Sequence, residues 1–91
     1  MDLIWETPSE MAMDLAKRIR KIRKRKKLTQ VQLAQRSNVS YGALKKFEQT
    51  GEISLISLIK IAMELNVSDE IKELFTDPVY LSIDEVLNDV N

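Results

Sequence analysis

The stretch Thr29–Gly51, TQVQLAQRSNVSYGALKKFEQTG, decides how this chain folds. It is predicted to form two short helices, because its apolar residues recur at helical spacing. Those residues are Val31, Leu33 and Ala34 in the first helix and Val39, Ala43, Leu44 and Phe47 in the second. Thr29 and Ser40 each stand one residue before a helix, where a side-chain oxygen can accept a hydrogen bond from a free backbone N–H.

A sharp reversal is expected between the two helices at Asn38. Asparagine enters the left-handed backbone region more readily than most residues other than glycine. Such a reversal sets the second helix across the first, which is helix-turn-helix geometry. The exposed face of the second helix then consists of Tyr41, Gly42, Lys45 and Lys46.

The charges of the chain are separated along its sequence, although its formal net charge is zero. Residues 16–50 hold twelve of the fourteen lysines and arginines and a single acid, Glu48, whereas residues 1–15 and 51–91 are acidic. A basic block that coincides with a helix-turn-helix is the electrostatic footprint of nucleic-acid binding. The alternative is a solvated, charged helix surface with no ligand.

The same stretch resembles the Cro/C1 repressor family (XRE-type helix-turn-helix proteins). The matching residues keep the family spacing without gaps and are Leu28-Thr29-Gln30, Leu33-Ala34, Val39-Ser40, Leu44 and Phe47-Glu48. The resemblance covers roughly residues 15–75 and implies an all-α fold, a compact five- to six-helix bundle of the lambda-repressor-like DNA-binding type. Two positions depart from the family: Asn38 replaces the usual turn glycine, and Gly42 replaces a longer polar side chain.

Around this motif the sequence predicts three parts, an apolar segment at residues 1–6, the DNA-binding domain at residues 7–76, and a tail with a short helix at residues 77–91. The first segment either meets a surface or is a frayed end. Thr7 and Glu10 form a capping box that opens a helix reaching about Lys27. Its expected apolar stripe is Met11, Leu15, Ile19 and Ile22.

Beyond the motif, Gly51 is a candidate helix C-cap and Ser54 a candidate N-cap for a helix that is apolar on more than one side. One side is expected to meet the core and another a second subunit. A short helix beginning at Ser68 carries Ile71, Leu74 and Phe75. A second capping box at residues 82–85 opens the helix of the tail.

The candidate DNA contacts fall into two sets. Side chains that can position the phosphate backbone are Gln30, Arg36, Gln49, Thr50, Lys26 and Lys27. For Gln30 this role follows from the resemblance, and the alternative is an ordinary exposed residue. Side chains at base-reading positions are Ser40, Tyr41, Gly42, Lys45 and Lys46, with Gly42 allowing close approach. Tyr41 could instead anchor the helix, and both lysines could bind phosphate only.

Arg23 and Glu48 are predicted to form a partly buried ion pair. It fixes the angle between the helix that Thr7 opens and the second helix of the motif, which is the expected recognition helix. The resemblance implies the pairing, and the isolation of Glu48 within a basic block supports it. Direct contact of either residue with DNA is the alternative.

Several function classes are disfavoured by composition. The chain contains no cysteine, so it has no disulfide framework and no thiolate metal site, and it contains no histidine, the commonest general base and metal ligand. No catalytic residue, metal site or cofactor is therefore predicted, and an enzyme is not expected. No membrane segment, signal peptide or domain for a small-molecule effector is evident, so a cytoplasmic protein of bacterial or phage type, associated with the nucleoid, is expected. RNA binding is disfavoured because stacking aromatics are few.

The sequence thus predicts a sequence-specific, double-stranded DNA-binding transcriptional regulator, a repressor or autorepressor. A homodimer on a pseudo-palindromic operator is expected, because a lone helix-turn-helix of this size covers little DNA. The alternative function is the antitoxin of a type II toxin–antitoxin pair, which binds operator DNA and neutralises a HipA-like kinase toxin. This alternative comes from a similarity to HipB-type antitoxins in compactness.

Overall fold

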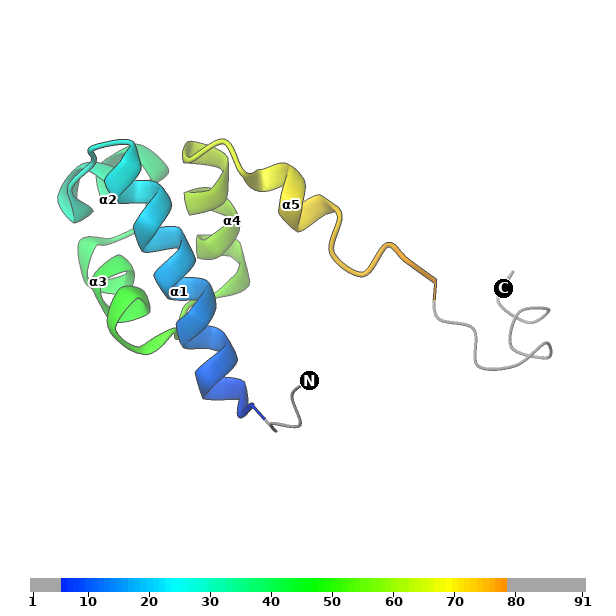
Figure 1. Cartoon of the computed structure of the whole chain (residues 1–91). Coiled ribbons are helices and arrows are strands. Elements are labelled where there is room, and N and C mark those ends of the chain that lie inside the picture. Colours follow the sequence, from blue (N-terminus) through cyan, green and yellow to red (C-terminus); the bar gives the residue numbers. More distant parts are fainter. Residues whose placement is uncertain (1–5, 79–91) are drawn as a thin grey trace, which may run out of the picture.

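Residues 6–78 are described by a computed structural model, and this part of the chain is all-helical, as the sequence predicts (Figure 1). The helices are α1 (Pro8–Arg25), α2 (Gln30–Ser37), α3 (Tyr41–Thr50), α4 (Leu55–Glu64) and α5 (Ser68–Lys72). The apolar segment predicted at residues 1–6, apart from its last residue, and the helix predicted in the tail lie outside the described residues. Within residues 6–78, no helix is both long and apolar enough to cross a bilayer.

Local chemistry sets the ends of the first three helices. Thr7 and Thr29 each form a capping box, and the Ser40 hydroxyl accepts the backbone N–H of Ala43 at 3.1 Å. Asn38 adopts the left-handed conformation, with φ 60° and ψ 40°. Gly51 ends α3 with φ 84°, a conformation that glycine adopts without steric cost. These caps and the turn at Asn38 are confirmed.

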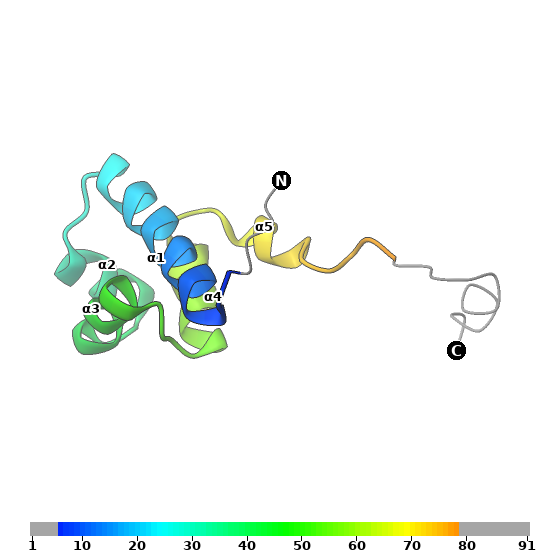
Figure 2. The ribbon, with the colours of Figure 1, turned by 60° about the horizontal axis from the view of Figure 1, so that its bottom comes forward.

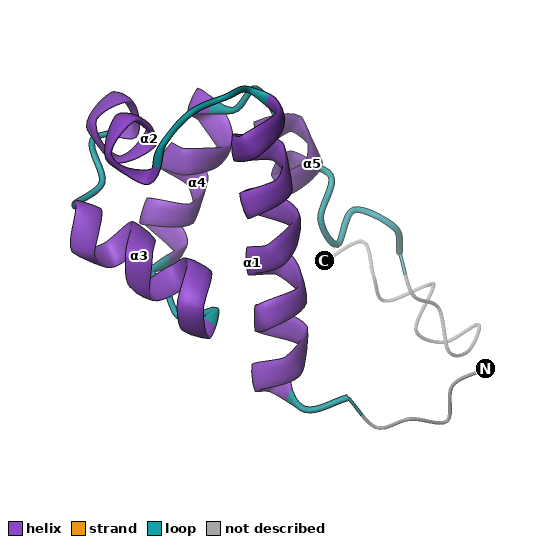
Figure 3. Ribbon diagram, turned by 60° about the vertical axis from the view of Figure 1, so that its left-hand side comes forward, coloured by secondary structure: helices purple, strands orange, loops and turns teal. Residues whose placement is uncertain are grey.

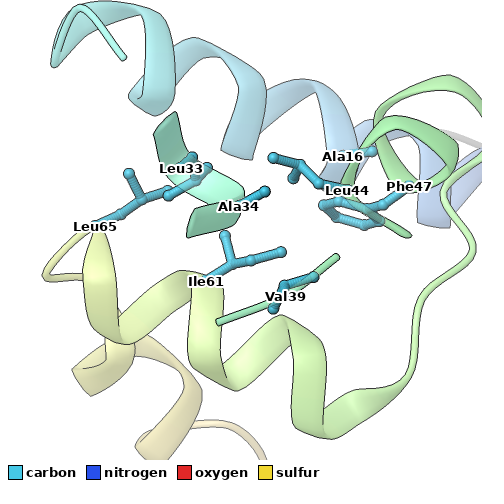
Figure 4. Close-up of a cluster of buried hydrophobic side chains, with 8 residues drawn as sticks. All are labelled: Ala16, Leu33, Ala34, Val39, Leu44, Phe47, Ile61 and Leu65. Atoms are coloured by element: carbon cyan, nitrogen blue, oxygen red, sulfur yellow. The ribbon is translucent and has the colours of Figure 1, made fainter. Parts of the chain in front are cut away.

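The helices pack so that α3 is held from two sides. α1 lies along α3, whereas α2 packs against both α3 and α4 (Figures 1 and 3). α5 contacts α4 and lies on the side of the bundle away from α3 (Figure 2). The buried cluster at the centre comes from the first four helices and the turns beside them, and it consists of Ala16, Leu33, Ala34, Val39, Leu44, Phe47, Ile61 and Leu65 (Figure 4).

The apolar stripe predicted for α1 is partly wrong. Met11 and Leu15 are 54% and 44% exposed, whereas Ala12 is half-buried and Ala16 is fully buried. The reason lies at Gly51, where an added Cβ would come within 2.7 Å of the Ala12 carbonyl carbon. Since the two backbones approach this closely, the first half of α1 turns Ala12 and Ala16 toward α3 and turns Met11 and Leu15 outward. The spacing of apolar residues alone does not report that close approach.

Three further expectations need correction. Val31 was predicted on the apolar face of α2 but is 48% exposed. α1 ends at Arg25 and not at Lys27, because Lys27 has φ 58° and cannot continue a right-handed helix. α5 ends at Lys72, so Leu74 and Phe75 lie beyond it, and Phe75 is 95% exposed. Neither side chain is buried against the described part of the bundle.

Candidate nucleic-acid interface

A buried ion pair joins α1 to the recognition helix. Arg23 Nε donates to Glu48 Oε2 at 2.7 Å, and Arg23 Nη2 donates to Glu48 Oε1 at 2.9 Å. The two side chains are 8% and 3% exposed. Arg23 Nη1 donates to the Leu28 carbonyl at 2.8 Å, so the same guanidinium also fixes the loop before α2. This bidentate geometry holds α3 at a set angle to α1.

Gln30 extends this pair to the first turn of α2. Its Nε2 donates to Glu48 Oε1 at 2.9 Å, so the carboxylate accepts hydrogen bonds from α1 and α2 while it belongs to α3. The amide of Gln30 has a second N–H, and its backbone N–H lies in the first turn, where no intrahelical acceptor is available. Gln30 can therefore hold Glu48 and still donate to a phosphate.

The face of α3 that points away from the core carries the predicted base-reading side chains. Tyr41 is 45% exposed, and Lys45 and Lys46 are exposed. Lys45 Nζ lies 5.9 Å from the centre of the Tyr41 ring, at the outer limit of a cation–π contact. An added Cβ on Gly42 would meet no atom within 4 Å outside the adjacent residues and the nearby backbone of α3 itself. The fold leaves this face open to a ligand.

Two hydroxyls near this face already hold the backbone. Ser40 Oγ accepts an N–H as the N-cap of α3, which leaves its O–H free to donate to a base or a phosphate. Thr50 Oγ1 donates to the Lys46 carbonyl at 2.8 Å and accepts the Glu52 N–H at 3.1 Å. A phosphate has no proton to offer, so Thr50 could bind one only by releasing the Lys46 carbonyl.

The other predicted phosphate contacts are all exposed but come from different elements. Lys26 and Lys27 follow α1, Arg36 lies in the last turn of α2, and Gln49 lies near the end of α3. The three cations can each neutralise a phosphate, and Gln49 can donate a hydrogen bond to one.

Sequence reasoning missed two charged residues at this interface. Glu52 lies in the turn after α3, and its Oε1 is 3.2 Å from Lys46 Nζ. Arg20 Nε comes within 3.9 Å of Glu48 Oε1 from the exposed side of α1. Arg20 stands one turn before Arg23, and that spacing is the only signal in the sequence that could have indicated its approach to Glu48. The meeting of Lys46 with Glu52 depends on the turn at Gly51, and no sequence spacing reports it.

A comparison with protein families identifies the fold. A family model described as helix-turn-helix matches residues 19–71, which is more than half of the chain and spans the last part of α1 through most of α5. No curated protein matches the chain. The matched range includes the Asn38 turn and all of α3. The chain belongs to the Cro/C1-type (XRE) helix-turn-helix family and is a DNA-binding regulator of that type.

Proposed function

We propose that this protein is a non-enzymatic repressor that binds a pseudo-palindromic operator in double-stranded DNA as a homodimer. The observation that carries the proposal is the buried network of Arg23, Gln30 and Glu48, which fixes the recognition helix while its outer face stays exposed. A rigid helix with an open polar face can enter a major groove without first being ordered. Repression follows if the bound operator overlaps a promoter.

The two contact levels have different chemistry. Exposed cations such as Lys26, Lys27 and Arg36 supply affinity that depends on salt and ignores sequence. The face of α3 supplies discrimination, because a lysine can donate to guanine O6 and N7 and a tyrosine can pack on a thymine methyl group. Lys46 and Tyr41 are the proposed readers of separate base pairs.

Gly42 supports close approach of α3 to the DNA. Its Cβ position is open, and its φ is not positive, so the described fold itself does not require glycine there. A glycine in a helix costs about 1 kcal/mol relative to alanine. We propose that this cost is kept because residue 42 lies against the groove, where a side chain would hold the helix away from the bases.

The exposed apolar side chains of α4 support the homodimer. Ile56 and Met63 are 63% and 61% exposed and lie two turns apart on the same side of the helix. Contact with a second copy would remove both side chains from water, which is favourable for association. A two-fold dimer pairs the same surface on both copies and presents two recognition helices to two half-sites, about 34–36 Å apart.

Sedimentation equilibrium tests the dimer with a matched pair of variants. Met63→Lys is expected to give a monomer, whereas Met11→Lys, which replaces a methionine that is 54% exposed on α1, is expected to remain a dimer. Both lysines would stand at exposed helix positions, so their effect on folding should be similar. A wild-type chain that sediments as a monomer at high concentration contradicts the dimer.

The operator itself is tested by selecting bound duplexes from random DNA. An inverted repeat with half-sites about one helical turn apart is expected. Repeating the selection with Tyr41→Ala and Lys46→Ala should relax one base position each, whereas uniform weakening marks a phosphate contact. Lys72→Ala in α5 removes the same charge as Lys46→Ala and should leave the selected sequence unchanged. Recovery of no common sequence contradicts the proposal.

The antitoxin function is the second candidate, and the surface beyond α4 favours it. The exposed acids Asp69, Glu70 and Glu73 lie beside Leu74 and Phe75, on the side of the bundle away from α3 (Figure 2). This surface leaves room for a basic, apolar partner while DNA is bound. Co-expression with the product of the neighbouring gene tests it. Relief of growth arrest supports an antitoxin, and unchanged growth contradicts it.

A further inference from the structure

Lys46, one of the proposed base-reading lysines, forms an ion pair with Glu52. Lys46 Nζ lies 3.2 Å from Glu52 Oε1, and the two side chains are 63% and 70% exposed. Lys46 belongs to the exposed face of α3, whereas Glu52 stands in the turn that leads to α4. The pair therefore lies at the edge of the surface that meets DNA, and either partner can reach solvent.

The backbone of the turn aims Glu52 at Lys46. Gly51 ends α3 in the left-handed conformation, so the chain changes direction before Glu52. Thr50 Oγ1 then joins the Lys46 carbonyl to the Glu52 N–H, at 2.8 Å and 3.1 Å. The two charged residues are thus connected through their backbones as well as through their side chains, so their proximity is built into the helix end.

A carboxylate at this position opposes DNA binding in two ways. It repels the phosphates near the end of α3, and it occupies the ammonium group that would otherwise bind them. Lys46 must leave Glu52 before it donates to a base or a phosphate. Because exposed ion pairs are weak, the pair can be displaced by a good acceptor and still hold Lys46 against a poor one.

We propose that Glu52 is a specificity-determining residue that competes with DNA for Lys46. This inference rests on the proposed function of α3 as a recognition helix. A guanine at the correct position offers Lys46 two acceptors on one base edge and replaces the lost carboxylate. A nonspecific duplex offers Lys46 only phosphate oxygens as acceptors. Glu52 therefore lowers unspecific affinity more than specific affinity and raises the ratio between them.

The test compares Glu52→Gln with the wild-type chain on the selected operator and on a scrambled duplex, by fluorescence anisotropy. Glu52→Gln should bind the scrambled duplex about two- to five-fold more tightly per subunit, the range expected for an exposed pair, with a smaller gain on the operator. In a Lys46→Met background the same change should give a smaller gain, because only the repulsion between Glu52 and the phosphates is then removed. Glu73→Gln, an exposed carboxylate on the side away from α3, is the control for net charge.

Each outcome decides the inference. Three results overturn the inference: no gain in affinity for Glu52→Gln, an equal gain in the Lys46→Met background, or an equal gain for Glu73→Gln. Each of them shows that Glu52 does not compete with DNA for Lys46. If the wild-type chain binds the operator and Glu52→Gln has the same affinity for both duplexes as the wild type, this inference alone is refuted. A wild-type chain that binds no duplex refutes the proposed function and the role of Glu52 together.

Discussion

Replacing Glu48 by alanine removes the carboxylate that Arg23 and Gln30 share. The guanidinium of Arg23, a residue only 7% exposed, then keeps a single partner, the Leu28 carbonyl. Its Nε and Nη2 lose their acceptor, and so does the Gln30 amide. Arg20, 3.9 Å from the carboxylate and more than half exposed, loses little by comparison. The change leaves a buried cation without its counter-ion.

The size of the effect follows from that burial. Removing one partner of a buried ion pair lowers the free energy of unfolding by about 3–5 kcal/mol. Because Arg23 keeps its hydrogen bond to the Leu28 carbonyl, we expect a loss of about 3 kcal/mol. A domain of this size has a free energy of unfolding of about 5–10 kcal/mol. The loss corresponds to a fall in Tm of about 12 °C or more, at about 4–8 °C for each kcal/mol.

Urea unfolding followed by circular dichroism measures this loss directly. Glu52→Ala is the matched control, because it removes an exposed carboxylate and should change the free energy of unfolding by less than about 0.5 kcal/mol. The double variant Arg23→Met with Glu48→Leu should recover much of the stability, since an apolar pair needs no counter-charge. A Glu48→Ala variant that loses less than about 1 kcal/mol would refute the structural role of the pair.

Three more predictions concern single positions. Gly51→Ala should lower the free energy of unfolding by about 3 kcal/mol or more in urea titration, because a Cβ meets Ala12 at 2.7 Å and the left-handed φ is strained for alanine. Gly42→Ala should raise Tm by a few degrees, since helix propensity improves by up to about 1 kcal/mol, but should weaken operator binding in anisotropy. The Thr7 backbone N–H, with a further contribution from the Thr7 hydroxyl, lowers the pKa of Glu10. The stability that this cap contributes should therefore be present above the ordinary carboxyl pKa and be lost as the pH falls through the lowered pKa. An NMR titration of the Glu10 carboxyl that shows an ordinary or raised pKa would contradict this.

The caps of the first three helices and the exposed face of α3 could be predicted from the sequence because each depends on local chemistry. Thr29, Ser40 and Gly51 act on backbone groups within a few residues of themselves, so a short window of sequence contains the signal. The outer face of α3 follows from helical periodicity once Leu44 and Phe47 are assigned to the core. No distant part of the chain needs to be known for either inference.

Features that depend on distant contacts could not be predicted in this way. The exposure of Met11 follows from the close approach of Ala12 to Gly51, which lies far along the chain. The commitment of Gln30 to Glu48 and of Lys46 to Glu52 likewise depends on how helices and turns meet in space. Periodicity reports which residues share a face, but it does not report what that face will touch.

The affinity for duplex DNA as a function of salt tests the central claim most directly. If the basic surface around α3 binds the phosphate backbone, the logarithm of the association constant should fall linearly with the logarithm of the salt concentration. Lys26→Ala should make that slope shallower by about 1 for each subunit bound, whereas Lys72→Ala on α5 should leave it unchanged. An affinity that is indifferent to salt, or a slope that responds equally to both variants, would contradict the assignment of the DNA-binding face.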